Sequence, residues 1–200
     1  MNHSGPYVSR GGMKLAAALD AFGLDVAGST CADAGCSHGG FTDCLLQHGA
    51  LKVYAVDTGY GLLDWKLRQD DRVAVLERTN ILHFDPVCLA GFAGCDLVVL
   101  DVGWTRQGRV IPAAIRWLAP HDQARIVTLI KPQYEASREQ LDSGVLADDV
   151  AMSVTQQVIG QIPAYGARVI RSIVSPIRGG GKRTKSQAGN TEYLALLARS

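Results

Sequence analysis

Short apolar runs of strand length alternate with segments of helical periodicity along most of the chain. The clearest strand is residues 96–101 (DLVVLD), whose continuous apolar interior is typical of a strand buried on both faces of a parallel sheet. The same kind of pattern predicts strands at 30–34, 52–57, 73–76 and 125–130. Apolar residues spaced three and four apart predict helices at 13–22, 40–48, 109–118 and 148–162.

The last two predicted strands, 168–174 and 192–197, flank a polar, glycine-rich loop at 178–190. We expect them to pair as an antiparallel hairpin that closes the sheet. Together with the preceding βα units, this predicts a mostly parallel, doubly wound α/β sheet of Rossmann type, formed as one domain over residues 1–200. Ligands of such sheets bind at the carboxyl ends of the strands, so the candidate functional residues follow each strand.

Composition and charge narrow the class of protein. A chain of 200 residues with 47% hydrophobic and 20% charged residues is a globular chain and not a disordered one. Its net charge of +1 gives no evidence for a nucleic-acid or membrane partner. Only a local cluster of basic residues could indicate such a partner. The five cysteines form no CxxC pair, and the N-terminus has no secretory signal. We therefore expect a cytoplasmic protein without a membrane segment.

A glycine-rich turn, ADAGCSHGGF at 32–41, follows the first predicted strand. Its glycines let the backbone approach a ligand closely, and the helix that begins there has free N–H groups. The spacing is not Gly-x-Gly-x-x-Gly, which weakens a dinucleotide interpretation. Asp33 and Asp57 make the predicted pocket anionic, which suits a cationic sulfonium cofactor, and Asp57 is placed to bind ribose hydroxyls. The alternative is a structural turn with Asp33 as a helix cap.

Charged residues follow the later strands. Asp101 and Lys131 end two predicted neighbouring strands, Glu192 begins the last one, and Lys14 lies in the first helix. Each alone is commonly a solvated strand end. Together they indicate a functional cluster, because a lysine among carboxylates stays charged and positions an anion, whereas a lysine in a drier place can act as a base. Such a set could deprotonate a hydroxyl group.

Several segments resemble one known family. They are YVSRGGMKL at 7–15, GGFTDCLL at 39–46, VYAVD at 53–57, WKLR at 65–68, LERTN at 76–80 and IKPQYE at 130–135. The chain resembles, over nearly its whole length, the methyltransferase domain of TlyA-type proteins, which belong to the FtsJ/RrmJ superfamily of ribose 2′-O-methyltransferases. Some members carry the name hemolysin. The family has an N-terminal S4 RNA-binding domain, which we expect this chain to lack.

The resemblance implies S-adenosylmethionine (SAM) as the methyl donor and RNA as the acceptor, in the form of rRNA or a ribosomal subunit. It implies a catalytic tetrad of Lys14, Asp101, Lys131 and Glu192. Lys131 would assist loss of the 2′-hydroxyl proton, Asp101 and Glu192 would orient and tune Lys131, and Lys14 would hold the substrate. The residues that the resemblance places against the cofactor are Asp33, Gly35, Ser37, Gly39, Gly40, Phe41, Asp57 and Asn80.

Departures from the family pattern leave alternatives open. Residues 103–106 (GWTR) replace the usual Ser-Phe-Ile-Ser beside the acceptor site, and Cys36 and His38 alter the glycine turn. A SAM-dependent small-molecule methyltransferase and a non-enzymatic RNA-binding module therefore remain rivals. The basic residues of the polar loop are either phosphate contacts for RNA or a solvated surface: Arg178, Lys182, Arg183 and Lys185. The Cys and His spacing near the turn fits no familiar zinc site, so no metal is expected.

Overall fold

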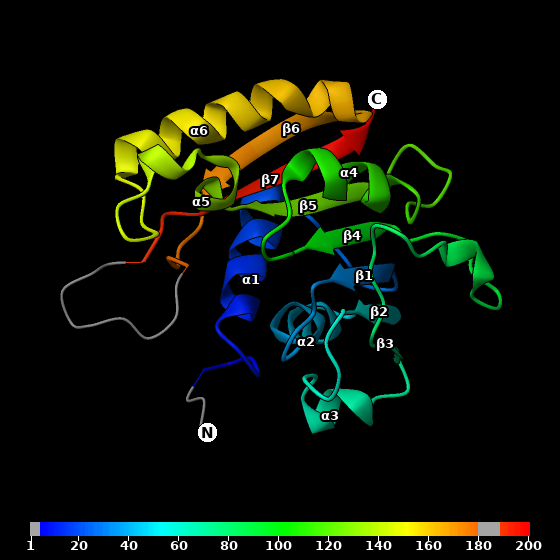
Figure 1. Cartoon of the computed structure of the whole chain (residues 1–200). Helices are drawn as coiled ribbons and strands as arrows, with labels where there is room; N and C mark the ends of the chain where they lie inside the picture. Colours follow the sequence, from blue (N-terminus) through cyan, green and yellow to red (C-terminus); the bar gives the residue numbers. More distant parts are fainter. Residues whose placement is uncertain (1–4, 180–188) are drawn as a thin grey trace.

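The computed structural model describes residues 5–179 and 189–200, which build one seven-stranded sheet with helices on both faces (Figure 1). The strands are β1 (Thr30–Ala34), β2 (Lys52–Val56), β3 (Val73–Leu76), β4 (Leu97–Leu100), β5 (Arg125–Ile130), β6 (Ala167–Val174) and β7 (Tyr193–Arg199). The helices are α1 (Gly11–Phe22), α2 (Gly40–Gln47), α3 (Trp65–Arg68), α4 (Gln107–Ile115), α5 (Pro132–Glu135) and α6 (Asp148–Gln161). Single 3₁₀ turns occur at Pro86–Cys88, Arg138–Gln140 and Ile162–Tyr165.

The strand order across the sheet is β3-β2-β1-β4-β5-β7-β6. Strands β1 to β5 run parallel, and β7 runs antiparallel to both β5 and β6. The predicted doubly wound sheet with its closing hairpin is therefore confirmed. Because β7 runs in the opposite direction, it starts at the edge where the parallel strands end. That reversal places residue 192 beside the end of β5.

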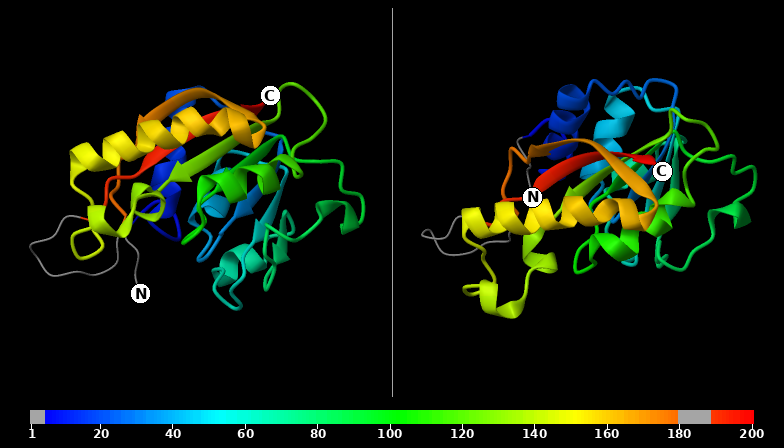
Figure 2. Two further views of the ribbon diagram at one scale, coloured as in Figure 1. Left: turned by 45° about the horizontal axis from the view of Figure 1, so that its top comes forward. Right: turned by 90° about the horizontal axis from the view of Figure 1, so that it is seen from above.

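The sheet separates two hydrophobic cores, and β4 shows why its sequence forms a central strand. Successive side chains of a strand point to opposite faces. Val98 and Leu100 pack into the core under α4 and α6, whereas Leu97 and Val99 pack into the core under α1 and α2. Figure 2 shows these two helix pairs on opposite sides of the sheet.

The long elements agree with the expectations from sequence, with a few residues of difference at some ends. The last strand was predicted to begin at Glu192. In the structure it begins at Tyr193, so Glu192 immediately precedes β7. The one-turn helices α3 and α5 were not expected, because four residues are too few to display a helical period.

Candidate active site

A cleft of about 1470 Å³ opens at the carboxyl ends of β1, β4 and β5. That volume exceeds the roughly 300–1,000 Å³ of a typical small-molecule pocket, so it has room for a cofactor and part of a second substrate. All four predicted catalytic residues line the cleft: Lys14, Asp101, Lys131 and Glu192. Of the predicted cofactor contacts, five line it: Asp33, Gly35, Ser37, Gly40 and Phe41.

The catalytic candidates form two ion pairs. The Nζ of Lys131 lies 2.5 Å from Oδ1 of Asp101, and the Nζ of Lys14 lies 2.5 Å from Oε2 of Glu192. Glu192 is almost fully buried, with 3% of its side chain exposed, whereas Asp101 keeps 25% exposed. Asp101 is thus the carboxylate that a substrate can reach. Glu192 bonds Lys14 and not Lys131; toward Lys131 it acts through its negative charge, which raises the pKa of Lys131.

The pKa of Lys131 lies above its ordinary value. Burial acts to lower this pKa, but the negative charges of Asp101 and Glu192 outweigh the effect of burial. Lys131 is therefore a cation in this structure. A cation there can donate a hydrogen bond to a substrate oxygen, but it accepts a proton only after losing one.

The glycine turn lies against the backbone of Asp101, one of the catalytic candidates. Gly35 has φ +82°, and a Cβ there would lie 2.5 Å from the carbonyl oxygen of Asp101. Gly39 has φ +91°, and a Cβ there would collide with the side chain of Leu67. Glycine suits both positions, because it adopts a positive φ without strain and has no Cβ to collide with its neighbours. The turn and Asp101 consequently share one wall of the cleft.

The segment before α1 covers the glycine turn. A Cβ at Gly40 would collide with Oγ of Ser9, and a Cβ at Gly12 would collide with the side chain of Tyr7. The backbone N–H of Val8 donates to Oδ2 of Asp43 in α2 at 2.8 Å, which ties this segment to the helix. Residues 9–11 line the cleft. Sequence analysis did not assign them to the site, although their Ser-Arg-Gly-Gly motif was the available signal.

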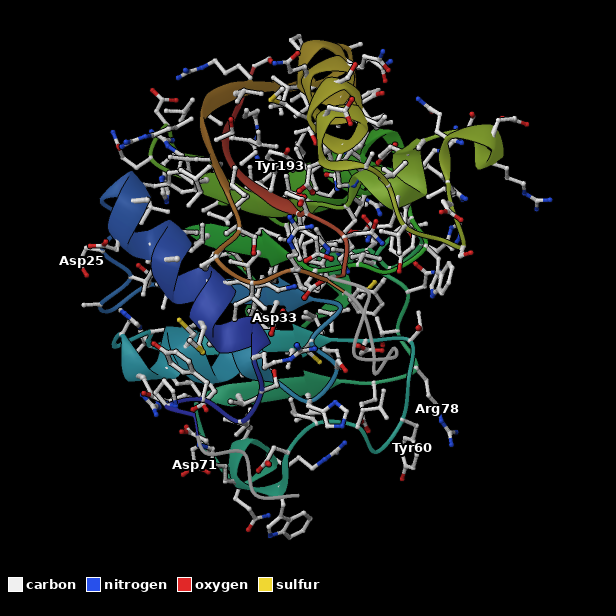
Figure 3. All side chains as sticks on the ribbon, turned by 90° about the vertical axis from the view of Figure 1, so that its left-hand side faces the viewer. Asp25, Asp33, Tyr60, Asp71, Arg78 and Tyr193 are labelled. Carbon is white, nitrogen blue, oxygen red and sulfur yellow. The ribbon has the colours of Figure 1, made fainter. Side chains whose placement is uncertain are left out.

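Asp33 combines complete burial with an unsatisfied oxygen. Its Oδ2 accepts hydrogen bonds from the backbone N–H of Thr42 at 2.8 Å and from the Thr42 hydroxyl at 2.7 Å. Its Oδ1 has no partner among the described residues, and Figure 3 shows Asp33 in the interior of the molecule. Burial raises the pKa of Asp33 to about 7, and the charge of Asp101 adds to this rise. A buried, unpaired carboxylate oxygen at the cleft fits a cationic ligand such as SAM.

The replacement Asp33→Asn tests that fit through pH. Because the pKa is about 7, Asp33 is neutral below that pH and anionic above it, so affinity for cationic SAM should rise as pH increases through about 7. The introduced carboxamide keeps an oxygen for Thr42 but never ionises, so SAM affinity of the variant should be weak and independent of pH. Calorimetry at several pH values measures both proteins. Asp25→Asn, on the surface in Figure 3, is the control, and a parent affinity that does not change with pH would contradict the assignment.

The structure places Asp57, Asn80 and Gly39 outside the residues that line the cleft. Asp57 follows β2, and its two carboxylate oxygens accept the backbone N–H of Ser37 at 2.8 Å and of Gly59 at 2.7 Å. Asn80 is exposed and accepts the N–H of Leu82 at 3.0 Å. Asp57 therefore braces the glycine turn, and the ribose and adenine contacts of Asp57 and Asn80 stay predictions.

The replacement Asp57→Ala should weaken SAM binding by roughly 1.5–3 kcal/mol, the usual range for lost hydrogen bonds to a charged group. The loss combines the predicted ribose contact with the brace on Ser37. Calorimetry gives the affinity, and thermal melting shows whether the variant folds. Asp70→Ala removes a carboxylate that also accepts a backbone N–H, at 3.0 Å from Arg72, and should leave SAM affinity unchanged. An Asp57→Ala protein with parent-like affinity would remove Asp57 from the cofactor site.

An aromatic pair, exposed at Trp104 and half-buried at Tyr134, also lines the cleft. Trp104 is 87% exposed, has φ +60°, and its ring centroid lies 4.9 Å from that of Tyr134. The ammonium of Lys131 lies 5.8 Å from the Tyr134 ring centroid. Both aromatic residues line the cleft together with Asp101 and Lys131. Trp104 was not among the residues predicted for the site, although the segment at 103–106 departs from the family pattern.

Arg178 is the one predicted RNA contact that lies within the described residues; Lys182, Arg183 and Lys185 lie outside them. Its guanidinium donates to Asp148 at 2.6 Å and to the carbonyl of Gly189 at 3.1 Å. Thr191 also donates to Asp148, at 2.6 Å. Arg178 lines the cleft but is held by these contacts, so its binding to RNA phosphate stays a prediction.

The described residues contain neither a cluster of metal ligands nor a helix that could span a membrane. Across residues 5–179 and 189–200, no three His, Cys, Asp or Glu side chains are grouped closely enough to bind a metal ion. Within the same part of the chain, no helix is both long and apolar enough to cross a bilayer.

The fold and the cleft define a class of protein, the SAM-dependent methyltransferases. A solved SAM-dependent methyltransferase from Listeria monocytogenes superposes with a TM-score of 0.63 over 96% of this chain and 100% of that one, at 13% identity. The family model described as FtsJ-like methyltransferase matches residues 7–196. The chain therefore belongs to the FtsJ-like methyltransferase family, which confirms the resemblance seen in the sequence, and its cofactor is SAM.

Two similar proteins are nearer in sequence. The 16S/23S rRNA (cytidine-2′-O)-methyltransferase TlyA of Mycobacterium tuberculosis is 40% identical over 193 residues, which are 96% of this chain and 68% of that protein. A solved structure named as a hemolysin, from Streptococcus thermophilus, is 39% identical with a TM-score of 0.89, and the match covers 100% of this chain and 70% of the other.

Proposed function

We propose that this protein transfers a methyl group from SAM to the ribose 2′-hydroxyl of a cytidine in rRNA, free or within a ribosomal subunit. The observation that carries the proposal is the shared wall of the cleft, where the glycine turn touches the backbone of Asp101 and Asp101 bonds Lys131. A methyl donor held by the turn is thereby adjacent to a pair of groups that can handle a hydroxyl proton. The name of the M. tuberculosis relative supports rRNA and cytidine as the acceptor. An rRNA substrate would place the protein in the cytoplasm.

The chemistry divides between the two ion pairs. SAM supplies a methyl group on a sulfonium, which an oxygen nucleophile attacks in line. The Lys131 ammonium donates a hydrogen bond to the 2′-oxygen and fixes the direction of its lone pair. Asp101, the carboxylate and more exposed member of its pair, receives the hydroxyl proton directly or through Lys131. The Lys14–Glu192 pair completes a set of two positive and two negative charges, which limits rearrangement when the substrate enters.

The aromatic pair of Trp104 and Tyr134 supports a nucleotide as the acceptor. A base can stack on the exposed face of Trp104, because every base has a π-face. Base–aromatic stacking is worth about 1–3 kcal/mol per base, so Trp104→Ala should lower kcat/KM for RNA by about five- to 150-fold. SAM affinity should stay unchanged.

The control for Trp104→Ala is Trp65→Ala. Trp65 is also exposed, at 71%, but lies in α3 outside the cleft-lining residues. Steady-state methyl transfer to rRNA measures both variants. Equal activity of the two variants would show that Trp104 does not contact the acceptor.

The test of the function is methyl transfer from labelled SAM to rRNA and ribosomal subunits, followed by digestion to nucleosides. Label in 2′-O-methylcytidine is the expected result. Label that appears only in small molecules of a nuclease-treated extract would replace RNA with a small-molecule acceptor. Tight RNA binding without any transfer would make the protein a binding module.

A further inference from the structure

Unpartnered buried polar atoms are rare in folded proteins, and each one calls for an explanation. Among the described residues, three buried side-chain atoms have no hydrogen-bond partner: Oδ1 of Asp33, Nε1 of Trp117 and Oε1 of Gln133. Trp117 belongs to the hydrophobic core below α4. The other two line the catalytic cleft. Asp33 lies on the cofactor side of the cleft. The Oε1 of Gln133 is the remaining atom, and the proposed function gives it no role.

The position of Gln133 assigns it to the acceptor side of the cleft. It lies in α5, two residues after Lys131 and next to Tyr134, whose ring contacts Trp104. The glycine turn follows β1, and the sheet order separates β1 from β5 by the whole of β4. A group on α5 is therefore on the side of the aromatic pair, away from the turn.

The carboxamide oxygen of Gln133 is an acceptor that no donor of the described residues meets. This Oε1 is buried and has no described donor within hydrogen-bond distance, and the residue itself lines the cleft. An amide oxygen removed from water in this way carries an uncompensated free-energy cost, which a ligand N–H can remove. The oxygen requires a donor, and the exocyclic amino group of a base supplies one.

We propose that Gln133 is a specificity-determining residue that accepts a hydrogen bond from the exocyclic amino group of the acceptor base. This inference rests on the proposed function and deepens it, because it states how cytidine is chosen. Cytosine offers an amino N–H at the position where uracil has a carbonyl oxygen. In the orientation that the structure shows, the Gln133 oxygen pairs with cytosine, whereas uracil pairs only if the carboxamide rotates so that Nε2 faces its oxygen.

The test replaces Gln133 by methionine, which is similar in length and shape but cannot accept this bond. The substrates are two unmethylated versions of the rRNA fragment that the protein modifies. One has cytidine at the target position and the other has uridine. Parent protein should prefer cytidine by about tenfold or more in kcat/KM. Gln133→Met should lower kcat/KM for the cytidine fragment by about tenfold or more and bring the preference toward one, with SAM affinity unchanged.

Gln156→Met is the matched control, because Gln156 is exposed on α6 and does not line the cleft. Thermal melting of both variants checks the fold. The Gln133 oxygen has no hydrogen bond to lose, so its replacement should not lower the melting temperature. A Gln133→Met protein with the parent preference for cytidine would overturn the inference while leaving the function intact. A parent protein that methylates neither fragment nor rRNA would overturn the proposed function and the inference together.

Discussion

Replacement of Lys131 by arginine is expected to lower single-turnover methyl transfer by about 10²–10⁴-fold, the usual contribution of a positioned proton-transfer group. Arginine keeps the positive charge, but its planar guanidinium neither loses a proton at accessible pH nor fits the place of an ammonium. In the parent protein, Lys131 Nζ lies 2.5 Å from Asp101 and close to the ring of Tyr134. SAM affinity should survive, because the glycine turn follows β1, and β4 lies between β1 and the strand that precedes Lys131.

The pH dependence separates the two roles of Lys131. Its pKa lies above the ordinary 10.5, so the residue is protonated at neutral pH. If it must accept the hydroxyl proton itself, the rate should keep rising with pH up to that raised pKa. If its cation orients the 2′-oxygen for Asp101, the rate should be flat at alkaline pH and fall only where Lys131 deprotonates.

Lys66→Arg is the control for this experiment, because Lys66 pairs with Asp43 outside the cleft and its side chain is 57% exposed. A Lys131→Arg protein that turns over at the parent rate would remove any proton-transfer role and leave only a positioning charge.

Replacement of Gly35 by alanine should eliminate SAM binding and methyl transfer together. A left-handed conformation costs an L-residue roughly 1–2 kcal/mol, and forced overlap in a packed site costs roughly 1–3 kcal/mol more. The added Cβ would lie 2.5 Å from the carbonyl oxygen of Asp101, which is backbone and cannot rotate away. Either the turn or the catalytic strand end must move, so cofactor and tetrad are disturbed by one methyl group.

Gly28→Ala isolates the collision from the backbone strain. Gly28 also has a left-handed conformation, at φ +71°, but a Cβ there has nothing within 4 Å. This variant should lower the free energy of unfolding by about 1–2 kcal/mol and leave SAM affinity unchanged. Chemical denaturation and calorimetry compare the two variants. Equal effects on SAM affinity would show that contact with Asp101 is not what makes Gly35 necessary.

The sequence predicted the sheet well, because burial on two faces gives strands such as β4 continuous apolar runs. The site was harder, since which carboxylate meets which lysine depends on contacts between distant segments. Lys14 and Glu192 are 178 positions apart, and nothing local indicates that they bond each other. The burial of Asp33 and of the Gln133 oxygen could not be predicted from the sequence either, because it depends on which residues pack around them in the fold.

The insertion of β7 between β5 and β6 has a consequence for the order of events during synthesis. Strand β6 pairs only with β7 in the sheet, so it has no partner until residues 193–199 have been made. The growing chain meanwhile has an open edge on β5 and an unpaired β6, both of which are surfaces prone to wrong association. Glu192 is made immediately before β7. Up to that moment, Lys14 lacks the carboxylate that it bonds in the finished protein, so the growing chain acquires its cofactor turn long before its complete catalytic cluster.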